Sequence, residues 1–74
     1  MTRLPRVTAR DVEQALLKAG FTFSHSRGSH RSYTRAGHRV IVPFHGSNVI
    51  PPGTLRSILR QASLSADELR ELLH

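Results

Sequence analysis

The sequence contains no cysteine and no tryptophan. The absence of cysteine excludes a disulfide framework, a thiolate metal site and a cysteine nucleophile. Apolar residues never run for more than three positions, whereas a membrane-spanning helix needs about 18, and no apolar segment near the start has the character of a signal peptide. A chain of 74 residues buries only about 60% of its surface on folding. These features predict one small domain, residues 1–74, in the cytoplasm and away from membranes.

Carboxylates are scarce, and they are missing from the middle of the chain. Eleven Lys and Arg residues stand against five Asp and Glu residues, which gives a formal net charge of +6. Asp11 and Glu13 lie near the start and the other acids follow Ala66, so that residues 14–66 contain none. Basic residues continue through that segment. A basic surface without neutralising acids is typical of a protein that binds a polyanion such as a nucleic acid.

Several classes of catalytic site are absent. The sequence has no H-E-x-x-H metal motif, no G-x-S-x-G elbow, no P-loop and no G-x-G-x-x-G, so we expect neither a metal nor a cofactor. Histidines among arginines remain. An imidazole can act as general base or acid near neutral pH, RNA carries its own nucleophile in the 2′-OH, and arginine stabilises the charge that builds up on phosphate. This combination predicts metal-independent RNA cleavage, whereas DNA, which lacks the 2′-OH, would be bound without being cut.

Local patterns predict the order α-β-β-β-α, followed by a short C-terminal helix. The first helix begins at Thr8, which forms a capping box with Asp11, and ends at Gly20. Strands are expected over 21–26, 29–34 and 38–44, joined by turns at 27–28 and 35–37. A second helix begins at residue 52 or 54, and Ser65 starts the last helix with an S-x-x-E capping box. The order predicts an α+β fold in which the helices cover one face of a three-stranded antiparallel sheet.

The alternation of side chains along a strand predicts which residues face the helices. On the second strand Tyr33 is the natural core residue, which leaves His30 on the open face of the sheet. On the first strand Phe21, Phe23 and His25 alternate with polar residues. We therefore expect both phenylalanines in the core and His25 along the same core-facing edge.

His30 is the best candidate for a catalytic residue. It begins a strand shortly after Gly28, which lets the backbone come close to a ligand, and Gly28 and Ser29 set the backbone that presents it. His45, in a polar loop after the third strand, is the next candidate. Three arginines are expected to bind phosphate around this site: Arg27, Arg31 and Arg39. Arg56 and Arg60 are expected to extend the basic surface that binds RNA.

Three motifs follow one another along the chain at characteristic spacings: Gly28-Ser29-His30, Val42-Pro43-Phe44-His45 and Gly53-Thr54-Leu55-Arg56-Ser57-Ile58. With Leu16 to Phe21 before them, they belong to a similarity that covers nearly the whole chain, roughly residues 9–73. In these motifs the sequence resembles the HicA family of toxins, from HicA–HicB toxin–antitoxin pairs. Arg27 stands where that family often has lysine, which keeps the positive charge.

The resemblance implies a fold like that of double-stranded-RNA-binding domains, in agreement with the element order above. It implies an mRNA interferase, a small endoribonuclease that cuts mRNA and stops translation, with His30 as its catalytic histidine. The implied partner is a HicB-type antitoxin that covers the active site. The chain alone would then be a monomer, and with its antitoxin a hetero-oligomer.

Two other functions are compatible with the same residues. The chain could be an RNA-binding module without catalysis, in which His30 only contacts phosphate or ribose. It could also be a protein-interaction domain whose basic face docks an acidic partner. If it is an enzyme, the residues do not decide whether His30 is the general base or the acid that protonates the leaving 5′-oxygen.

Overall fold

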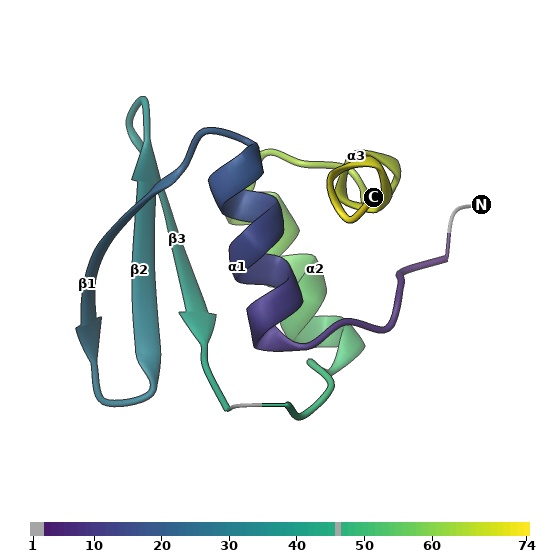
Figure 1. The fold of residues 1–74 in the computed structure, drawn as a ribbon, viewed down its shortest axis with the longest axis horizontal. Helices are drawn as coiled ribbons and strands as arrows, with labels where there is room; N and C mark the ends of the chain where they lie inside the picture. The colour runs from purple at the N-terminus through teal and green to yellow at the C-terminus, as the bar shows by residue number, and fades with distance from the viewer. Residues whose placement is uncertain (1–2, 46) are drawn as a thin grey trace.

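The computed structural model describes residues 3–45 and 47–74. Three helices and three strands follow one another along the chain (Figure 1). The strands form one antiparallel sheet in the order β1-β2-β3. This confirms the predicted α+β fold and its additional C-terminal helix. The elements are α1 (Ala9–Lys18), β1 (Thr22–Arg27), β2 (His30–Arg35), β3 (His38–Pro43), α2 (Pro52–Ala62) and α3 (Ala66–Leu72).

The helix ends are fixed by the local sequence, as predicted. Thr8 Oγ1 accepts a hydrogen bond from the Asp11 amide (3.2 Å), and Asp11 Oδ2 accepts one from the Thr8 amide (3.0 Å). Ser65 and Glu68 form the same reciprocal capping box at the start of α3. Gly20, with φ +96°, ends the first helical segment in the left-handed region that favours glycine. These caps satisfy backbone groups that helix ends would otherwise leave unpaired.

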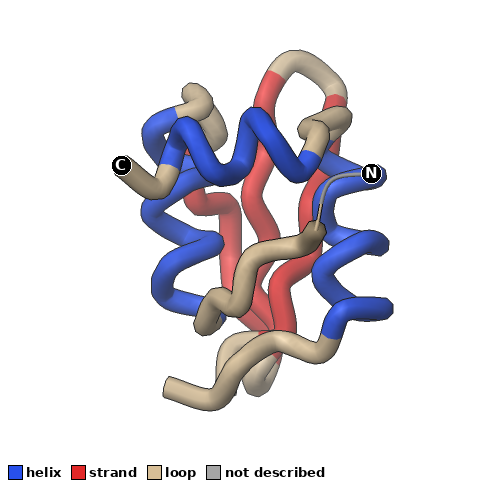
Figure 2. Tube along the Cα trace, turned by 90° about the vertical axis from the view of Figure 1, so that its right-hand side faces the viewer, coloured by secondary structure: helices blue, strands red, loops and turns tan. Residues whose placement is uncertain are grey.

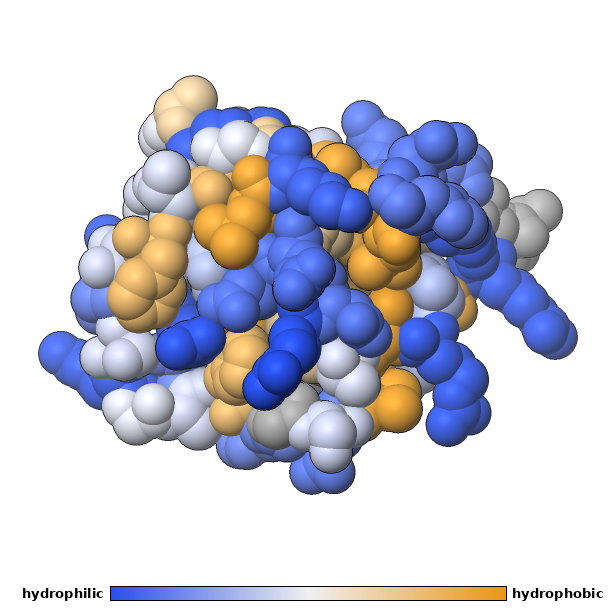
Figure 3. Space-filling view, viewed as in Figure 1, coloured by the Kyte–Doolittle hydropathy of each residue, from blue (hydrophilic) through white to orange (hydrophobic). Residues whose placement is uncertain are grey.

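The helices cover one face of the sheet, and Figure 2 shows them in front of the strands from that side. Each of the two longer helices turns one apolar stripe toward the strands, and α3 packs against α1, farther from the sheet. On the face seen in Figure 3, hydrophilic side chains cover most of the surface and apolar ones emerge in separate patches. The best-buried large side chains of the core are Val12, Leu16, Phe21, Tyr33, Val40, Val42, Leu55, Ile58 and Leu69.

Strand β1 departs from the predicted alternation. Phe23 pairs with Tyr33, but His25 pairs with Ser32, the next residue back along β2, so that Ser24 is an extra residue in a β-bulge. The bulge turns His25 to the face opposite Phe23. The prediction that His25 faces the core is therefore wrong. The prediction that Phe23 is buried is also wrong, because this side chain on the outer strand is 47% exposed.

A polar network lies between α1 and the core-facing side of β2. The Tyr33 hydroxyl donates a hydrogen bond to Glu13 Oε2 (2.5 Å), and Arg31 Nη1 donates to the same oxygen (2.8 Å). Tyr33 is fully buried. Its burial, followed by the hydrogen bond to Glu13 and the nearby negative charge, raises the pKa of the Tyr33 phenol well above its ordinary value of 10.0. The network thus stabilises the protonated phenol.

The raised pKa of Tyr33 predicts a loss of stability at alkaline pH. The protonated Tyr33 phenol contributes fully to the free energy of unfolding below the pKa of an unfolded tyrosine, about 10. This contribution is lost as pH rises through the higher pKa that Tyr33 has in the folded protein. The Tyr33→Phe variant should lack this alkaline loss, and at neutral pH it should be about 1.5–3 kcal/mol less stable because a hydrogen bond to a charged group is gone. Denaturant unfolding at several pH values checks both effects.

An absorbance titration gives an independent check, because Tyr33 is the only tyrosine and the chain has no tryptophan. The phenolate band of the folded protein should appear at higher pH than that of the protein in denaturant. Coincident titrations, with the fold intact throughout, would contradict the assigned environment of Tyr33.

Candidate active site

The face of the sheet turned away from the helices is called the open face here. The strand register places its side chains in three rows, because directly paired residues share a face. The rows are Arg27-His30-Pro43, His25-Ser32-Ile41 and Thr22-Thr34-Arg39. The open face therefore carries His30, as predicted from the core position of Tyr33.

A depression of about 460 Å³ lies on the open face. Buried Ser32 lies at its centre on the middle strand, and exposed side chains surround it. Its lining combines two imidazoles and two guanidinium groups with no carboxylate. This is the arrangement expected of a phosphate site that also needs a group able to move protons. The lining residues are His25, Arg27, His30, Ser32, Arg39 and Ile41.

The turn before β2 places His30 at the rim of this depression. Gly28 has φ +58°, and a side chain added there would meet open space but a strained backbone. The Ser29 carbonyl accepts a hydrogen bond from the Phe44 amide (2.6 Å), which holds the end of β3 beside the turn. His30 then begins β2, directly opposite Arg27. Gly28 and Ser29 thus form the turn that leads into His30.

His25 is a lining residue that the alternation pattern missed. It lies in the row next to that of His30, so that His25 and His30 are diagonal neighbours on the paired strands β1 and β2. Diagonal neighbours are about 7–8 Å apart, a distance that long and aromatic side chains can bridge. Ser24 Oγ is 3.1 Å from His25 Nδ1. A signal for this position exists in the sequence: counting back from a two-residue turn at Gly28-Ser29 pairs His25 with Ser32 and therefore places it on the face of His30.

Arg31 lies on the other side of the sheet. Its guanidinium is 2.8 Å from Glu13 and lies over the rings of Phe44 (4.5 Å) and Phe23 (5.3 Å). These contacts fasten β2 to α1 and to the end of β3. The phosphate-binding role predicted for Arg31 has no support in this arrangement, whereas Arg27 and Arg39 both line the depression.

Arg56 and Arg60 lie on the exposed flank of α2. The neighbouring side of this helix faces the edge of β3, where Gln61 Oε1 accepts a hydrogen bond from the Ile41 amide (3.0 Å). Successive helix residues differ by about 100° in direction, so the two arginines point away from that edge. They add positive charge to the molecule without lining the depression.

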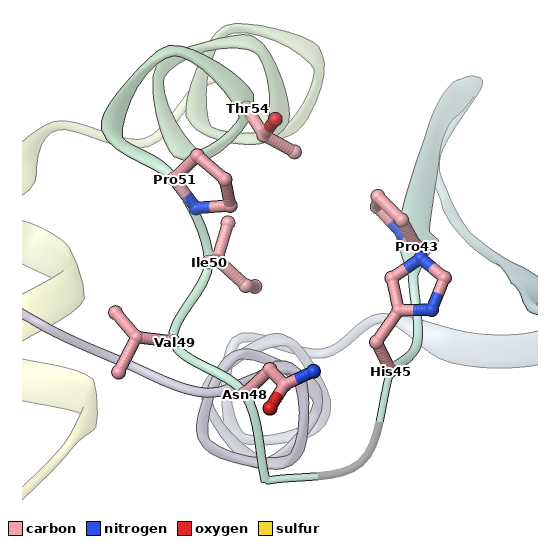
Figure 4. A pocket seen from close by; sticks show the side chains of 7 residues that line it. All are labelled: Pro43, His45, Asn48, Val49, Ile50, Pro51 and Thr54. Atoms are coloured by element: carbon pink, nitrogen blue, oxygen red, sulfur yellow. The ribbon is translucent and has the colours of Figure 1, made fainter.

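His45 lines a separate hollow of about 340 Å³ between the end of β3 and the start of α2 (Figure 4). Its ring lies beside Pro43, across the hollow from Ile50 and Pro51. The Ile50 amide donates to the Val7 carbonyl (2.8 Å), which holds the far wall of the hollow against the N-terminal segment. The structure therefore does not place His45 in the depression that contains His30.

Within the described residues, no group of three or more His, Cys, Asp or Glu side chains is arranged to hold a metal ion. None of the described helices combines the length and the apolar character needed to cross a membrane. The polar side chains that line the depression on the open face carry imidazole, guanidinium and hydroxyl groups.

Comparison with known proteins bears on this site. No curated protein matches the chain. A family model described as the HicA toxin of bacterial toxin–antitoxin systems matches residues 9–64, which extend from the first residue of α1 past the end of α2 and include the whole open face. The match covers well over half of the sequence and leaves residues 1–8 and the C-terminal segment that contains α3 outside it. The chain therefore belongs to the HicA family of toxins.

Proposed function

We propose that this protein is a metal-independent endoribonuclease that cuts mRNA in the cytoplasm and thereby stops translation. The observation that supports the proposal most is the position of His30. It lies on a face without carboxylates, directly opposite Arg27 and in one depression with Arg39. An imidazole there can act on a phosphodiester that two guanidinium groups hold.

In the proposed reaction His30 is the general base. It takes the proton of the 2′-OH, whose oxygen attacks the adjacent phosphorus. Arg27 and Arg39 bind the phosphate oxygens and stabilise the negative charge that grows on them in the transition state. Because the nucleophile comes from the substrate, the proposed reaction needs neither a nucleophilic side chain nor a metal-bound water. The same requirement for a 2′-OH means that RNA is cut and DNA is not.

The proposed regulator is a HicB-type antitoxin that covers the open face. This face exposes Arg27, Arg39 and two histidines and has no acidic side chain in its depression, so an acidic segment of the partner would complement it. Covering the depression would keep RNA away from His30. The free toxin would be a monomer, and the inactive form a hetero-oligomer with the antitoxin.

The His30→Ala variant tests the catalytic assignment. Purified wild-type and variant proteins are incubated with a long single-stranded RNA in EDTA, and the products are separated on a denaturing gel. We expect cleavage by the wild type and a loss of at least about 100-fold in the variant, the usual contribution of a general acid or base. RNA binding and thermal unfolding should change little, because His30 is exposed.

The His38→Ala variant is a matched control, since His38 is also an exposed strand histidine but lies at the opposite end of the sheet, paired with Arg35. It should cleave like the wild type. Equal cleavage by all three proteins would reject His30 as the catalytic residue. Binding without cleavage by any of them would support a non-catalytic RNA-binding module.

The salt dependence of RNA binding tests the phosphate contacts. If about five phosphates of single-stranded RNA are neutralised, log K should fall with log salt concentration at a slope near −3.5. Replacing Arg27 and Arg39 with glutamine should make the slope shallower by about 1.4, because each lost phosphate contact contributes about 0.7. Fluorescence anisotropy over a range of salt concentrations measures the slope.

The control is a double variant, Arg6→Gln with Arg10→Gln, which removes the same charge from exposed positions in the N-terminal segment and α1. Its slope should stay close to that of the wild type. Equal changes in the two double variants would mean that net charge, rather than contacts on the open face, determines the affinity.

A further inference from the structure

We infer that His25 is the general acid of the reaction, the residue that protonates the 5′-oxygen as it leaves. The inference rests on the proposed function, since it completes the proton transfers that His30 begins. Departure of an alkoxide is unfavourable at neutral pH, and a positioned acid contributes about 100- to 10,000-fold to such a step. The proposed site therefore still requires a group that can donate a proton to the leaving oxygen.

The bulge at Ser24 is the structural feature that supplies this imidazole. Without the extra residue, regular alternation from Phe23 would turn His25 toward the helices. With it, His25 pairs with Ser32 and lines the same depression as His30. Bulges are known to redirect side chains beside active sites. In this chain the bulge places two imidazoles on neighbouring strands and in neighbouring rows of one face.

The spacing of the two histidines suits a phosphodiester. The attacking and leaving oxygens lie on opposite sides of the phosphorus, so acid and base must approach from two directions. Diagonal neighbours on paired strands are about 7–8 Å apart at the backbone, which leaves room for a phosphate between two imidazole rings. His25 and His30 have this diagonal relation in the β1–β2 register.

The groups around His25 fit the role of an acid that acts on a bound phosphate. The charged and titratable side chains that share its depression are Arg27, His30 and Arg39, one from each strand. Its Nδ1 lies 3.1 Å from Ser24 Oγ. This contact orients the ring and leaves Nε2 free to donate to a leaving oxygen.

The 2′-oxygen forms a bond to phosphorus while its proton passes to the neutral imidazole of His30. The bond between phosphorus and the 5′-oxygen breaks, and its electron pair stays on that oxygen, which takes the proton of the His25 imidazolium. The products are a 2′,3′-cyclic phosphate and a 5′-hydroxyl. His30 ends protonated and His25 neutral, and exchange with water restores both.

The described structure offers one other histidine near this end of the sheet, His45, and it is a weaker candidate. It lines the hollow between β3 and α2 rather than the depression of His30. His38 pairs with Arg35 at the opposite end. His25 is thus the histidine whose position on the open face fits the missing acid.

An RNA with a sulfur-containing leaving group tests the inference directly. The wild-type cleavage site is first mapped on a short RNA. A second RNA of the same sequence then carries sulfur in place of the 5′-bridging oxygen at that site, so that the leaving thiolate departs without being protonated. Single-turnover cleavage rates of both RNAs are measured for the wild type and for His25→Ala, His25→Arg, His30→Ala, His45→Ala and His38→Ala.

We expect His25→Ala to lose at least about 100-fold on the natural RNA and to cleave the sulfur-containing RNA within a few-fold of the wild type. His25→Arg should be as slow as His25→Ala on the natural RNA, because a guanidinium keeps the charge but does not release its proton. His30→Ala should be slow on both RNAs. His38→Ala should match the wild type on both.

The other outcomes reject the inference or its foundation, and they differ. If the wild type cleaves neither RNA, the proposed function fails. If the wild type cleaves, three results would show that His25 is not the general acid. The first is that His25→Ala cleaves the natural RNA as fast as the wild type, and the second is that His25→Arg does so. The third is that His25→Ala still binds RNA but is equally slow on both RNAs. If His45→Ala or His30→Ala shows the sulfur rescue instead, the acid is that residue and the inference is overturned.

Discussion

The burial of Tyr33 is the constraint from which the arrangement of the site follows. Its ring lies fully within the core, and its hydroxyl bonds to Glu13 of α1. This fixes the middle strand with one defined face toward the helices. Because side chains alternate along β2, His30 must then lie on the open face and Arg31 on the covered one. If the opposite face of this strand were turned toward the helices, the two would exchange places and the imidazole would lie on the covered side.

The same constraint explains how a chain that contains acids can present a face without them. Glu13 is held between Tyr33 and Arg31 on the covered side of the sheet. Asp11 and Glu68 bond to the backbone at the starts of α1 and α3, and Asp67 pairs with Arg70. Each of these carboxylates has a structural partner away from the open face. These contacts keep the four carboxylates on the helix side of the sheet and leave the rows of the open face without an acid.

The sequence predicted the parts of the fold that depend on local interactions. Capping boxes at Thr8 and Ser65 involve residues three positions apart, and the facing of β2 follows from one large aromatic residue. The side of the sheet on which His25 lies was predicted wrongly, because it depends on the pairing of β1 with β2, which alternation within β1 cannot reveal. Counting forward from Phe23 places His25 in the core, whereas counting back from the turn places it on the open face, and the extra residue Ser24 reconciles the two. The position of Arg31 needed the structure for a similar reason, since its partners Glu13 and Phe44 come from other elements.

The proposed site also accounts for why such a protein would need a partner. A face that gathers arginine and histidine without acids repels itself and destabilises the compact state, and a chain of this size has little apolar burial with which to offset that cost. In the proposed function RNA would relieve the repulsion only while it is bound, because the products leave after cleavage. An acidic protein segment bound to the same face would relieve the repulsion continuously. One interaction would then both cover the imidazoles and stabilise the fold. On this argument the charge that would let the proposed site bind RNA would also make the open face a lasting binding surface for an antitoxin.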